Sequence, residues 1–260
     1  MSIGETLSWT FGTYTSSFVT FFIPILVSSL ITGFLGSALT FYIASLPQLS
    51  SPATQTQIWT WFLNYIPILL LAAFALGILS WIIGIIANGI VVKCASDLTE
   101  KGSANLMNAF NHAASKLLSL LAVGIITGIF IILGLIALII PGIILGIMFS
   151  LVVPAVIIEN QGAIESLTRS RRLVSHRWLK TFAFLLIIGI IVGVTSAIVN
   201  WIASPISIFG GASGSIVSSV LSAILTALVL PIYPIALTIY YYSMLAKEQP
   251  SLPPPPPPIL

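Results

Sequence analysis

The chain's densest group of chemically capable side chains lies at residues 159–180, ENQGAIESLTRSRRLVSHRWLK. Basic residues beside a membrane attract anionic lipid headgroups by about 1 kcal/mol each, and a Trp ring favours the membrane interface. We expect this segment to bind lipid headgroups or a cytoplasmic partner, through Arg169, Arg171, Arg172, Arg177, Trp178 and Lys180. The same charges also suit an ordinary role in fixing the orientation in the membrane, and that alternative stays open.

Two acidic residues of this segment are candidates for ion pairs. Glu165 precedes Arg169 by four residues, which is the favourable order on a helix. Glu159 directly follows Ile157 and Ile158, where an apolar run ends, so we expect an arginine to offset its desolvation. Proton or ion handling is an alternative role for Glu159, and so is that of a general base.

The rest of the chain offers little catalytic chemistry. The single cysteine, Cys94, excludes an intramolecular disulfide, and His112 has no second ligand at metal spacing. We predict no catalytic residue, no metal site and no cofactor. Three polar side chains within apolar stretches, Asn64, Asn88 and Asn200, either hydrogen-bond between helices or line a transport path. No Asp, Glu, Lys or Arg lies midway along such a stretch, which argues against a proton-coupled transporter.

Membrane helices must position these residues. Of the 260 residues, 58% are hydrophobic and only 6% are charged, whereas about a quarter are charged in soluble domains. About 20 apolar residues cross the roughly 30 Å of bilayer hydrocarbon. The sequence predicts an all-α bundle with six spans, at residues 18–43, 61–92, 117–140, 141–158, 182–203 and 216–245. We place a tight hairpin at Pro141 and Gly142, because proline begins a new helix after a turn.

The distribution of charge predicts the orientation. The loops at residues 44–60 and 204–215 carry no charge, so all nine Lys and Arg residues lie on the other side. Under the positive-inside rule that side is cytoplasmic, which predicts a multi-pass protein of the cell membrane with both termini inside. Nine basic residues on so apolar a chain cannot make the broad basic face that nucleic acid requires, so membrane lipids are the expected partners.

Three cytoplasmic segments share one spacing of mostly bulky or apolar positions. Counted from Leu7, Leu106 and Leu167, these positions recur at offsets of 4, 7 and 11, which follow one face of an α-helix. We predict three interfacial amphipathic helices, each opening a unit with two spans, at about residues 1–92, 103–158 and 163–245. True repetition and chance similarity both remain open.

The membrane domain is predicted to cover residues 1–248, and residues 249–260 form a proline-rich tail. Such a sequence favours an extended polyproline II conformation with no packed core. We predict a disordered tail, and docking on an aromatic-lined groove of a protein partner is the alternative.

Residues 149–178, FSLVVPAVIIENQGAIESLTRSRRLVSHRW, resemble the membrane domain of some glycerophosphoryl diester phosphodiesterases and related stand-alone membrane domains of unknown function. The matching positions are Pro154, Glu159, Ser166, Leu167, Arg169, Ser170 and Leu173. The resemblance implies a six-span membrane fold. The phosphodiesterase barrel, with its metal-binding acidic and histidine residues, is missing from the sequence, so the resemblance implies no activity.

We expect a non-enzymatic membrane protein, a scaffold or accessory subunit, that contacts lipid headgroups or a partner through residues 163–180. One alternative is a transporter or permease with a cavity among helices kinked by proline, lined by Asn64, Asn88, Asn200 or Glu159. The other alternative is a membrane enzyme that acts on lipids with Glu159 as its base.

Overall fold

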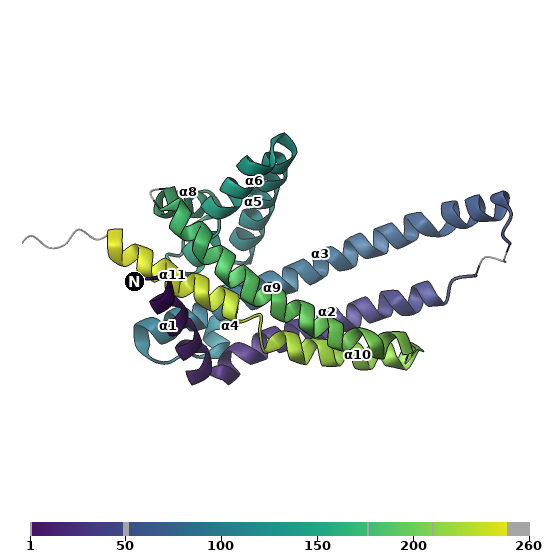
Figure 1. Cartoon of the computed structure of the whole chain (residues 1–260), viewed down its shortest axis with the longest axis horizontal. Coiled ribbons are helices and arrows are strands. Elements are labelled where there is room, and N and C mark those ends of the chain that lie inside the picture. The colour runs from purple at the N-terminus through teal and green to yellow at the C-terminus, as the bar shows by residue number, and fades with distance from the viewer. Residues whose placement is uncertain (1, 49–51, 176, 210, 249–260) are drawn as a thin grey trace, which may run out of the picture.

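The computed structural model describes residues 2–48, 52–175, 177–209 and 211–248, and within them the fold is all-α (Figure 1). Its helices are α1 (Ile3–Ser16), α2 (Phe18–Ala44), α3 (Gln55–Lys101), α4 (Leu106–Ser115), α5 (Leu117–Ala137), α6 (Ile139–Met148), α7 (Val152–Ile158), α8 (Ala163–Ser175), α9 (Trp178–Phe209), α10 (Gly211–Ala227) and α11 (Ile232–Glu248). The predicted proline-rich tail, residues 249–260, lies outside the described residues.

Six segments of the described chain are long and apolar enough to cross a membrane. They are Phe18–Ala44, Gln55–Lys101, Leu117–Ala137, Ile139–Ile158, Trp178–Pro205 and Ile216–Glu248. Each overlaps one of the six predicted spans, so the predicted all-α bundle is confirmed.

Helix α3 extends past both ends of the predicted span at residues 61–92. Its 47 residues, at 1.5 Å each, make a helix about 70 Å long, more than twice the roughly 30 Å of bilayer hydrocarbon. Thr54 and Gln57 form a capping box at its start, and Gly102 ends it in the left-handed conformation. Capping at both ends, rather than the limits of the apolar run, therefore sets the length of α3.

The hairpin between the third and fourth spans turns at Leu138, three residues before the predicted position. Leu138 is extended, and Pro141 and Gly142 already belong to the first turn of α6. Proline fits there because the first N–H groups of a helix have no partner within it. A side chain on Gly142 would lie 2.5 Å from Leu135, so glycine lets α5 and α6 approach closely.

The fourth and sixth spans are each interrupted. Helix α6 gives way to α7 at residues 149–151, and α10 gives way to α11 at residues 228–231. Pro154 lies in the first turn of α7 and Pro231 directly precedes α11, which are positions that suit the start of a helix. Both spans therefore consist of two helices each.

A short helix from elsewhere in the chain contacts each interruption. The hydroxyl of Ser170 in α8 donates to the Met148 carbonyl at 2.7 Å and accepts from the Leu151 N–H at 3.2 Å. The hydroxyl of Tyr14 in α1 donates to the Leu228 carbonyl at 2.8 Å. Non-helical backbone inside a membrane must find such partners, because lipid offers none.

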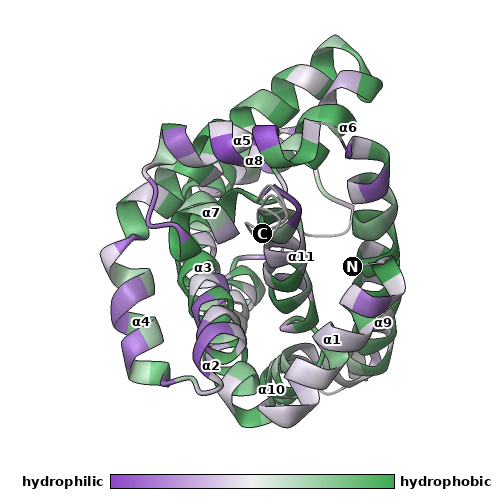
Figure 2. Ribbon diagram, turned by 90° about the vertical axis from the view of Figure 1, so that its left-hand side faces the viewer, coloured by the Kyte–Doolittle hydropathy of each residue, from purple (hydrophilic) through white to green (hydrophobic). Residues whose placement is uncertain are grey.

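Helix α11 stands in the middle of the bundle with the other helices around it (Figure 2). It contacts α1, α3, α7, α8 and α9. Most of its residues from Ile232 to Met244 are buried, and Phe184 of α9 stacks on Tyr240 with the ring centroids 4.3 Å apart. A helix that is apolar and buried on all sides belongs to the core of a bundle, so α11 is the central helix.

The three short helices predicted ahead of the span pairs are α1, α4 and α8, and their buried faces match the predicted stripe in part. The residues at offset 7, Tyr14, Ala113 and Val174, are buried as predicted. The residues at offset 4 are exposed: Phe11, Phe110 and Arg171. The residues one position earlier are fully buried: Thr10, Ala109 and Ser170. These buried residues are small, so each helix packs closely against the spans at this position. Their shared offset supports the threefold pattern, and a place at the membrane interface stays a prediction.

Candidate functional site

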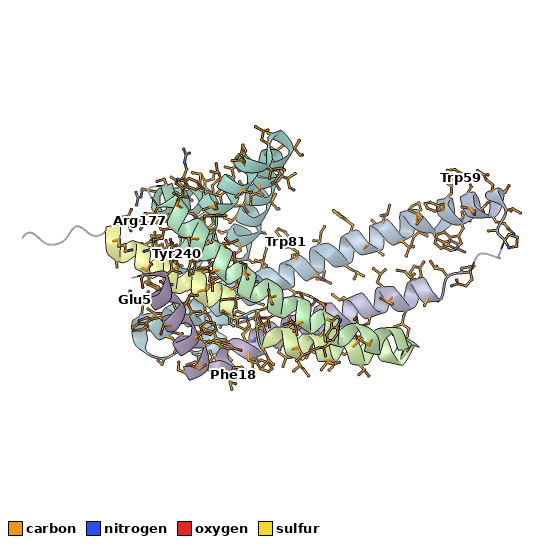
Figure 3. The ribbon with its side chains drawn as sticks, in the orientation of Figure 1. Glu5, Phe18, Trp59, Trp81, Arg177 and Tyr240 are labelled. Carbon is orange, nitrogen blue, oxygen red and sulfur yellow. The ribbon has the colours of Figure 1, made fainter. Side chains whose placement is uncertain are left out.

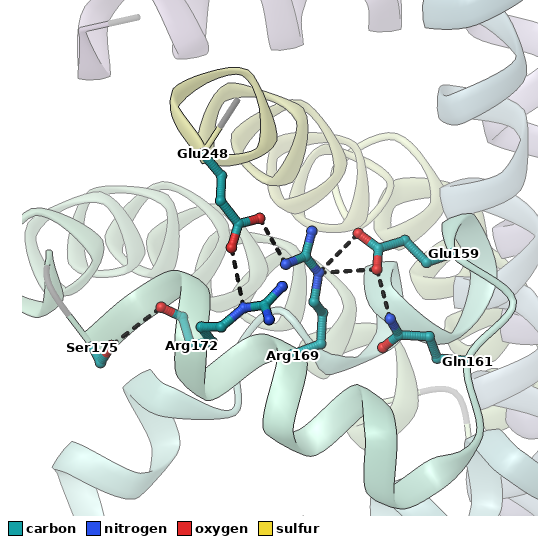
Figure 4. Close-up of polar contacts among 6 residues, drawn as sticks. All are labelled: Glu159, Gln161, Arg169, Arg172, Ser175 and Glu248. Atoms are coloured by element: carbon teal, nitrogen blue, oxygen red, sulfur yellow. Dashed lines mark hydrogen bonds and ion pairs between the residues drawn. The ribbon is translucent and has the colours of Figure 1, made fainter. Parts of the chain in front are cut away.

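Glu159, Arg169, Arg172 and Glu248 form a group of ion pairs that we call the arginine cluster (Figure 4). Nε of Arg169 donates to the two carboxylate oxygens of Glu159 at 3.0 and 2.9 Å. Its Nη1 donates to Glu248 at 2.6 Å, and Nε of Arg172 lies 3.1 Å from the other oxygen of Glu248. Gln161 donates to Glu159 at 2.7 Å. The cluster therefore joins α7, α8 and α11.

The course of the chain brings these side chains together. Glu159 is the C-cap of α7, and Asn160, with a φ of 55°, turns the chain toward α8. Asparagine adopts this left-handed conformation more readily than most residues. Arg169 lies midway along α8, and Glu248 is the last residue of α11. The C-terminal ends of α7 and α11 thus meet one face of α8.

Arg169 is the most enclosed member of the arginine cluster. Its side chain is 12% exposed, against 23% for its partner Glu159. Burial disfavours the charged guanidinium, but the hydrogen bonds to Glu159 and Glu248 outweigh this and raise the pKa of Arg169 above its ordinary value. Arg169 is therefore charged at every physiological pH, and its contacts lie within the protein.

The residues predicted to bind headgroups or a partner do not form one surface. Those with exposed side chains are Arg171, Arg172 and Trp178. Those that are half-buried are Arg169, Arg177 and Lys180, and Nη1 of Arg177 lies 3.7 Å from the sulfur of Met244. Glu165 is exposed and takes part in none of the ion pairs found among the described residues. Arg171 and Arg172 are thus the arginines that the outer face of α8 presents.

Residues 240–242 are three consecutive tyrosines of α11 that were not singled out in the sequence. The first hydroxyl lies 3.0 Å from that of Thr181 in α9, and the second faces the arginine cluster. The third lies 2.8 Å from Ser96 and donates to Glu100, both in α3. Successive helix residues point about 100° apart, so a run of three polar rings could have indicated a helix with partners on several sides.

An apolar cavity of about 470 Å³ lies among the spans. Both interrupted spans line it, with Phe149, Val152 and Pro154 from the fourth and Leu230, Tyr233 and Pro234 from the sixth. The cavity-lining residues of α11 end at Leu237, about one turn before the tyrosines at residues 240–242. Figure 3 shows Trp81, another lining residue, along the length of the molecule between Glu5 and Arg177 at one end and Trp59 at the other.

Of the three asparagines predicted as intramembrane polar residues, Asn88 lines this cavity and donates to the Gly84 carbonyl at 2.8 Å. Asn64 lies on the outer part of α3 in a shallow surface pocket beside Trp61. Asn200 is exposed and donates to the Ser196 carbonyl of its own helix at 2.9 Å. None of these hydrogen bonds joins two helices, so within the described structure these amides do not tie spans together.

The described residues offer two features of defined chemistry, the arginine cluster and the apolar cavity. No three His, Cys, Asp or Glu side chains gather there in a way that could hold a metal ion. Glu159 accepts from Arg169 and Gln161, and Cys94 is buried. The arginine cluster fixes helices, and the cavity offers apolar volume.

Comparison with known proteins gives one match. A family model described as Domain of unknown function (DUF7847) matches residues 4–244, which is almost the whole described chain. No curated protein and no solved structure matches. The resemblance to stand-alone membrane domains of unknown function agrees with this result, whereas nothing here links the chain to glycerophosphoryl diester phosphodiesterases.

Proposed function

We propose that this chain, which belongs to the family Domain of unknown function (DUF7847), is a non-enzymatic membrane protein that holds a lipid-like molecule between its spans. The observation that carries the proposal is the cavity onto which both interrupted spans open. Interrupted helices that meet at one cavity are the arrangement by which membrane proteins place ligand sites among their spans.

The size and lining of the cavity support this proposal. Its volume of about 470 Å³ falls within the roughly 300–1,000 Å³ of ligand pockets. Its walls are mostly apolar, and its side chains with hydrogen-bonding groups are Trp81, Asn88, Thr127 and Tyr233. Ligand sites of this kind combine a large apolar surface with a few polar groups.

The bonds around the end of α11 suggest how a ligand enters. The tyrosines at residues 240–242 and the arginine cluster surround α11 between the cavity and the chain terminus. Three lining side chains of the cavity, Trp81, Asn88 and Tyr233, are exposed on the outside of the bundle. A lipid-like ligand therefore enters from the bilayer, which agrees with a permease-like or carrier function more than with a pore.

A second candidate function is that of a scaffold that binds headgroups or a partner through α8. The observation that favours it is the exposed face of this helix, where Arg171 and Arg172 lie near the outward-facing Ile164. Basic and apolar residues on one short helix suit a membrane surface. Because Arg169 and Arg172 are both engaged in the arginine cluster, this function involves fewer residues than the sequence suggests.

The same proposal includes the orientation of the chain in the membrane, its family relation and its binding partners. We place both termini in the cytoplasm, since the described Lys and Arg residues avoid the loops that face the other side. A distant relation to the membrane domain of glycerophosphoryl diester phosphodiesterases rests on residues 149–178 alone. Membrane lipids are the proposed partners, and the tail at residues 249–260 is a candidate for a protein partner.

Replacing glycine in the cavity wall tests the proposed function. A Cβ on Gly124 would lie 2.7 Å from the Trp81 ring, whereas a Cβ on Gly128, one turn along α5, meets nothing within 4 Å. Gly124→Val therefore fills or distorts the cavity, and Gly128→Val is its matched control. We expect a lipid-like molecule to copurify with the unmodified chain and with Gly128→Val, and to be lost from Gly124→Val.

A further inference from the structure

The cavity wall carries no charge, which limits the ligands that it can take. Its lining residues belong to α2, α3, α5, α7, α9 and α11 and the adjoining breaks, and none is Asp, Glu, Lys, Arg or His. A charged group placed there would lose its hydration with no opposite charge in the wall, at a cost of several kcal/mol. Fatty-acid carboxylates and phosphate-bearing lipids are thus poor occupants of this space.

The polar groups in the wall can recognise an uncharged group. Tyr233 lines the cavity, and its hydroxyl makes no hydrogen bond among the described residues. Asn88 uses one N–H for the Gly84 carbonyl, which leaves its Oδ1 and second N–H for a ligand. The hydroxyl of Thr127 already donates to the Val123 carbonyl at 2.7 Å. The Tyr233 hydroxyl can donate to a ligand oxygen, and the Asn88 amide can donate its second N–H or accept at Oδ1. A hydroxyl or a carbonyl group of a ligand can therefore bond both side chains.

We propose that the ligand is a neutral amphiphile with one hydrocarbon chain and one hydroxyl or carbonyl group, bonded by Tyr233 and Asn88. This rests on the proposed function, since it names the class of molecule that the cavity holds. The volume of about 470 Å³ lies in the lower part of the range for ligand pockets, which suits a single chain better than a two-chain lipid.

Trp81 provides a reporter for this site, because its indole ring lines the cavity. Three probes of equal chain length, brominated in mid-chain to quench tryptophan fluorescence, are added to the full chain in nanodiscs. They are stearyl alcohol, its permanently charged sulfate ester, and octadecane. The part of the quenching that is lost in Trp81→Phe belongs to Trp81. This difference separates the response of Trp81 from that of the other five tryptophans.

We expect the alcohol to quench Trp81 at a mole fraction about tenfold or more below that of the sulfate ester. Loss of one hydrogen bond in Tyr233→Phe should raise the mole fraction of alcohol for half-quenching about three- to tenfold and leave octadecane unchanged. Asn88→Leu should act in the same direction. Thermal unfolding of both variants without probe checks that they fold as the unmodified chain does.

The outcomes separate the two proposals. Equal quenching by the alcohol and the sulfate ester, or an unchanged alcohol response in Tyr233→Phe and Asn88→Leu, would overturn the neutral-amphiphile inference while the cavity still binds apolar molecules. Absence of Trp81 quenching by all three probes would overturn the proposed function itself.

Discussion

The hydroxyl of Ser170 donates to the carbonyl of Met148 at 2.7 Å, so a short helix bonds the backbone at the interruption of the fourth span. The same hydroxyl accepts from the N–H of Leu151, on the other side of the interruption. One side chain therefore satisfies two backbone groups that the helix ladder leaves free. Because Phe149 of this interruption lines the cavity, α8 bonds the backbone at a place that borders the cavity.

Ser170→Ala should destabilise the protein. It leaves a buried N–H without a partner and deprives a buried carbonyl of its donor, and an unsatisfied buried group costs about 1–3 kcal/mol. Thermal unfolding in detergent measures the effect. Thr168→Ala is the control, because this exposed residue of the same helix bonds only the Ile164 carbonyl of its own turn. If both variants unfold at the same temperature, the bonds to the interruption do not stabilise the fold.

Replacing Arg169 of the arginine cluster should destabilise the protein more than replacing Arg171, which lies outside the cluster. Arg169→Met leaves the partly buried Glu159 without its partner, which we expect to cost about 2–4 kcal/mol. Arg171→Met, on the exposed face, should change stability by less than about 0.5 kcal/mol. The double variant Glu159→Gln and Arg169→Met should regain part of the loss, since no carboxylate is then left unpaired. Additive losses in the double variant would show that the two residues do not act as a pair.

The hairpin of α5 and α6 should tolerate a methyl group at one glycine and not at another. A Cβ on Gly142 would lie 2.7 Å from the backbone nitrogen of Leu135, whereas a Cβ on Gly146 meets only Ile131 at 3.9 Å. We expect Gly142→Ala to cost about 1–3 kcal/mol and Gly146→Ala to be neutral or slightly stabilising, because alanine favours a helix. Chemical or thermal unfolding of both variants measures this. An equal effect of both changes would contradict the close approach of the two helices.

Labelling of introduced cysteines tests the orientation. The native Cys94 is buried, so the unmodified chain should not react with a membrane-impermeant maleimide. Arg171→Cys should react only when the cytoplasmic side is accessible, and Gln48→Cys, in the loop between α2 and α3, only from the other side. The reverse pattern would place the termini outside.

The spans could be predicted from the sequence because the length of an apolar run is a local property with a fixed requirement of about 20 residues. The turn at Leu138 could not be placed, since Pro141 is equally compatible with a turn and with the first turn of a helix. The stripe on the short helices was predicted correctly at offset 7, where Tyr14, Ala113 and Val174 are buried, but Phe11, Phe110 and Arg171 at offset 4 were also expected to share that face. Instead the small Thr10, Ala109 and Ser170 do so.

The two interruptions that border the cavity could not be predicted from the sequence, for a different reason. Residues 149–151 and 228–231 are nearly as apolar as the helices around them, and the prolines in or beside them, Pro154 and Pro231, are equally compatible with the start of a helix. The backbone groups at the interruptions bond the side chains of Ser170 and Tyr14. Tyr14 lies 214 residues from its partner Leu228 in the chain. Asn88 was predicted to line a cavity in one alternative, whereas Tyr233 carried no signal that set it apart from the other tyrosines.

Mass spectrometry of what copurifies with the full chain in mild detergent tests the central claim most directly. Lipid-like molecules are compared for the unmodified chain, Gly124→Val and Gly128→Val, at equal protein and after removal of loosely bound lipid. The account predicts one class of small apolar molecule at close to one per chain in the unmodified protein and in Gly128→Val, reduced at least about fivefold in Gly124→Val. The same amount in all three proteins, or no retained molecule in any of them, would contradict it.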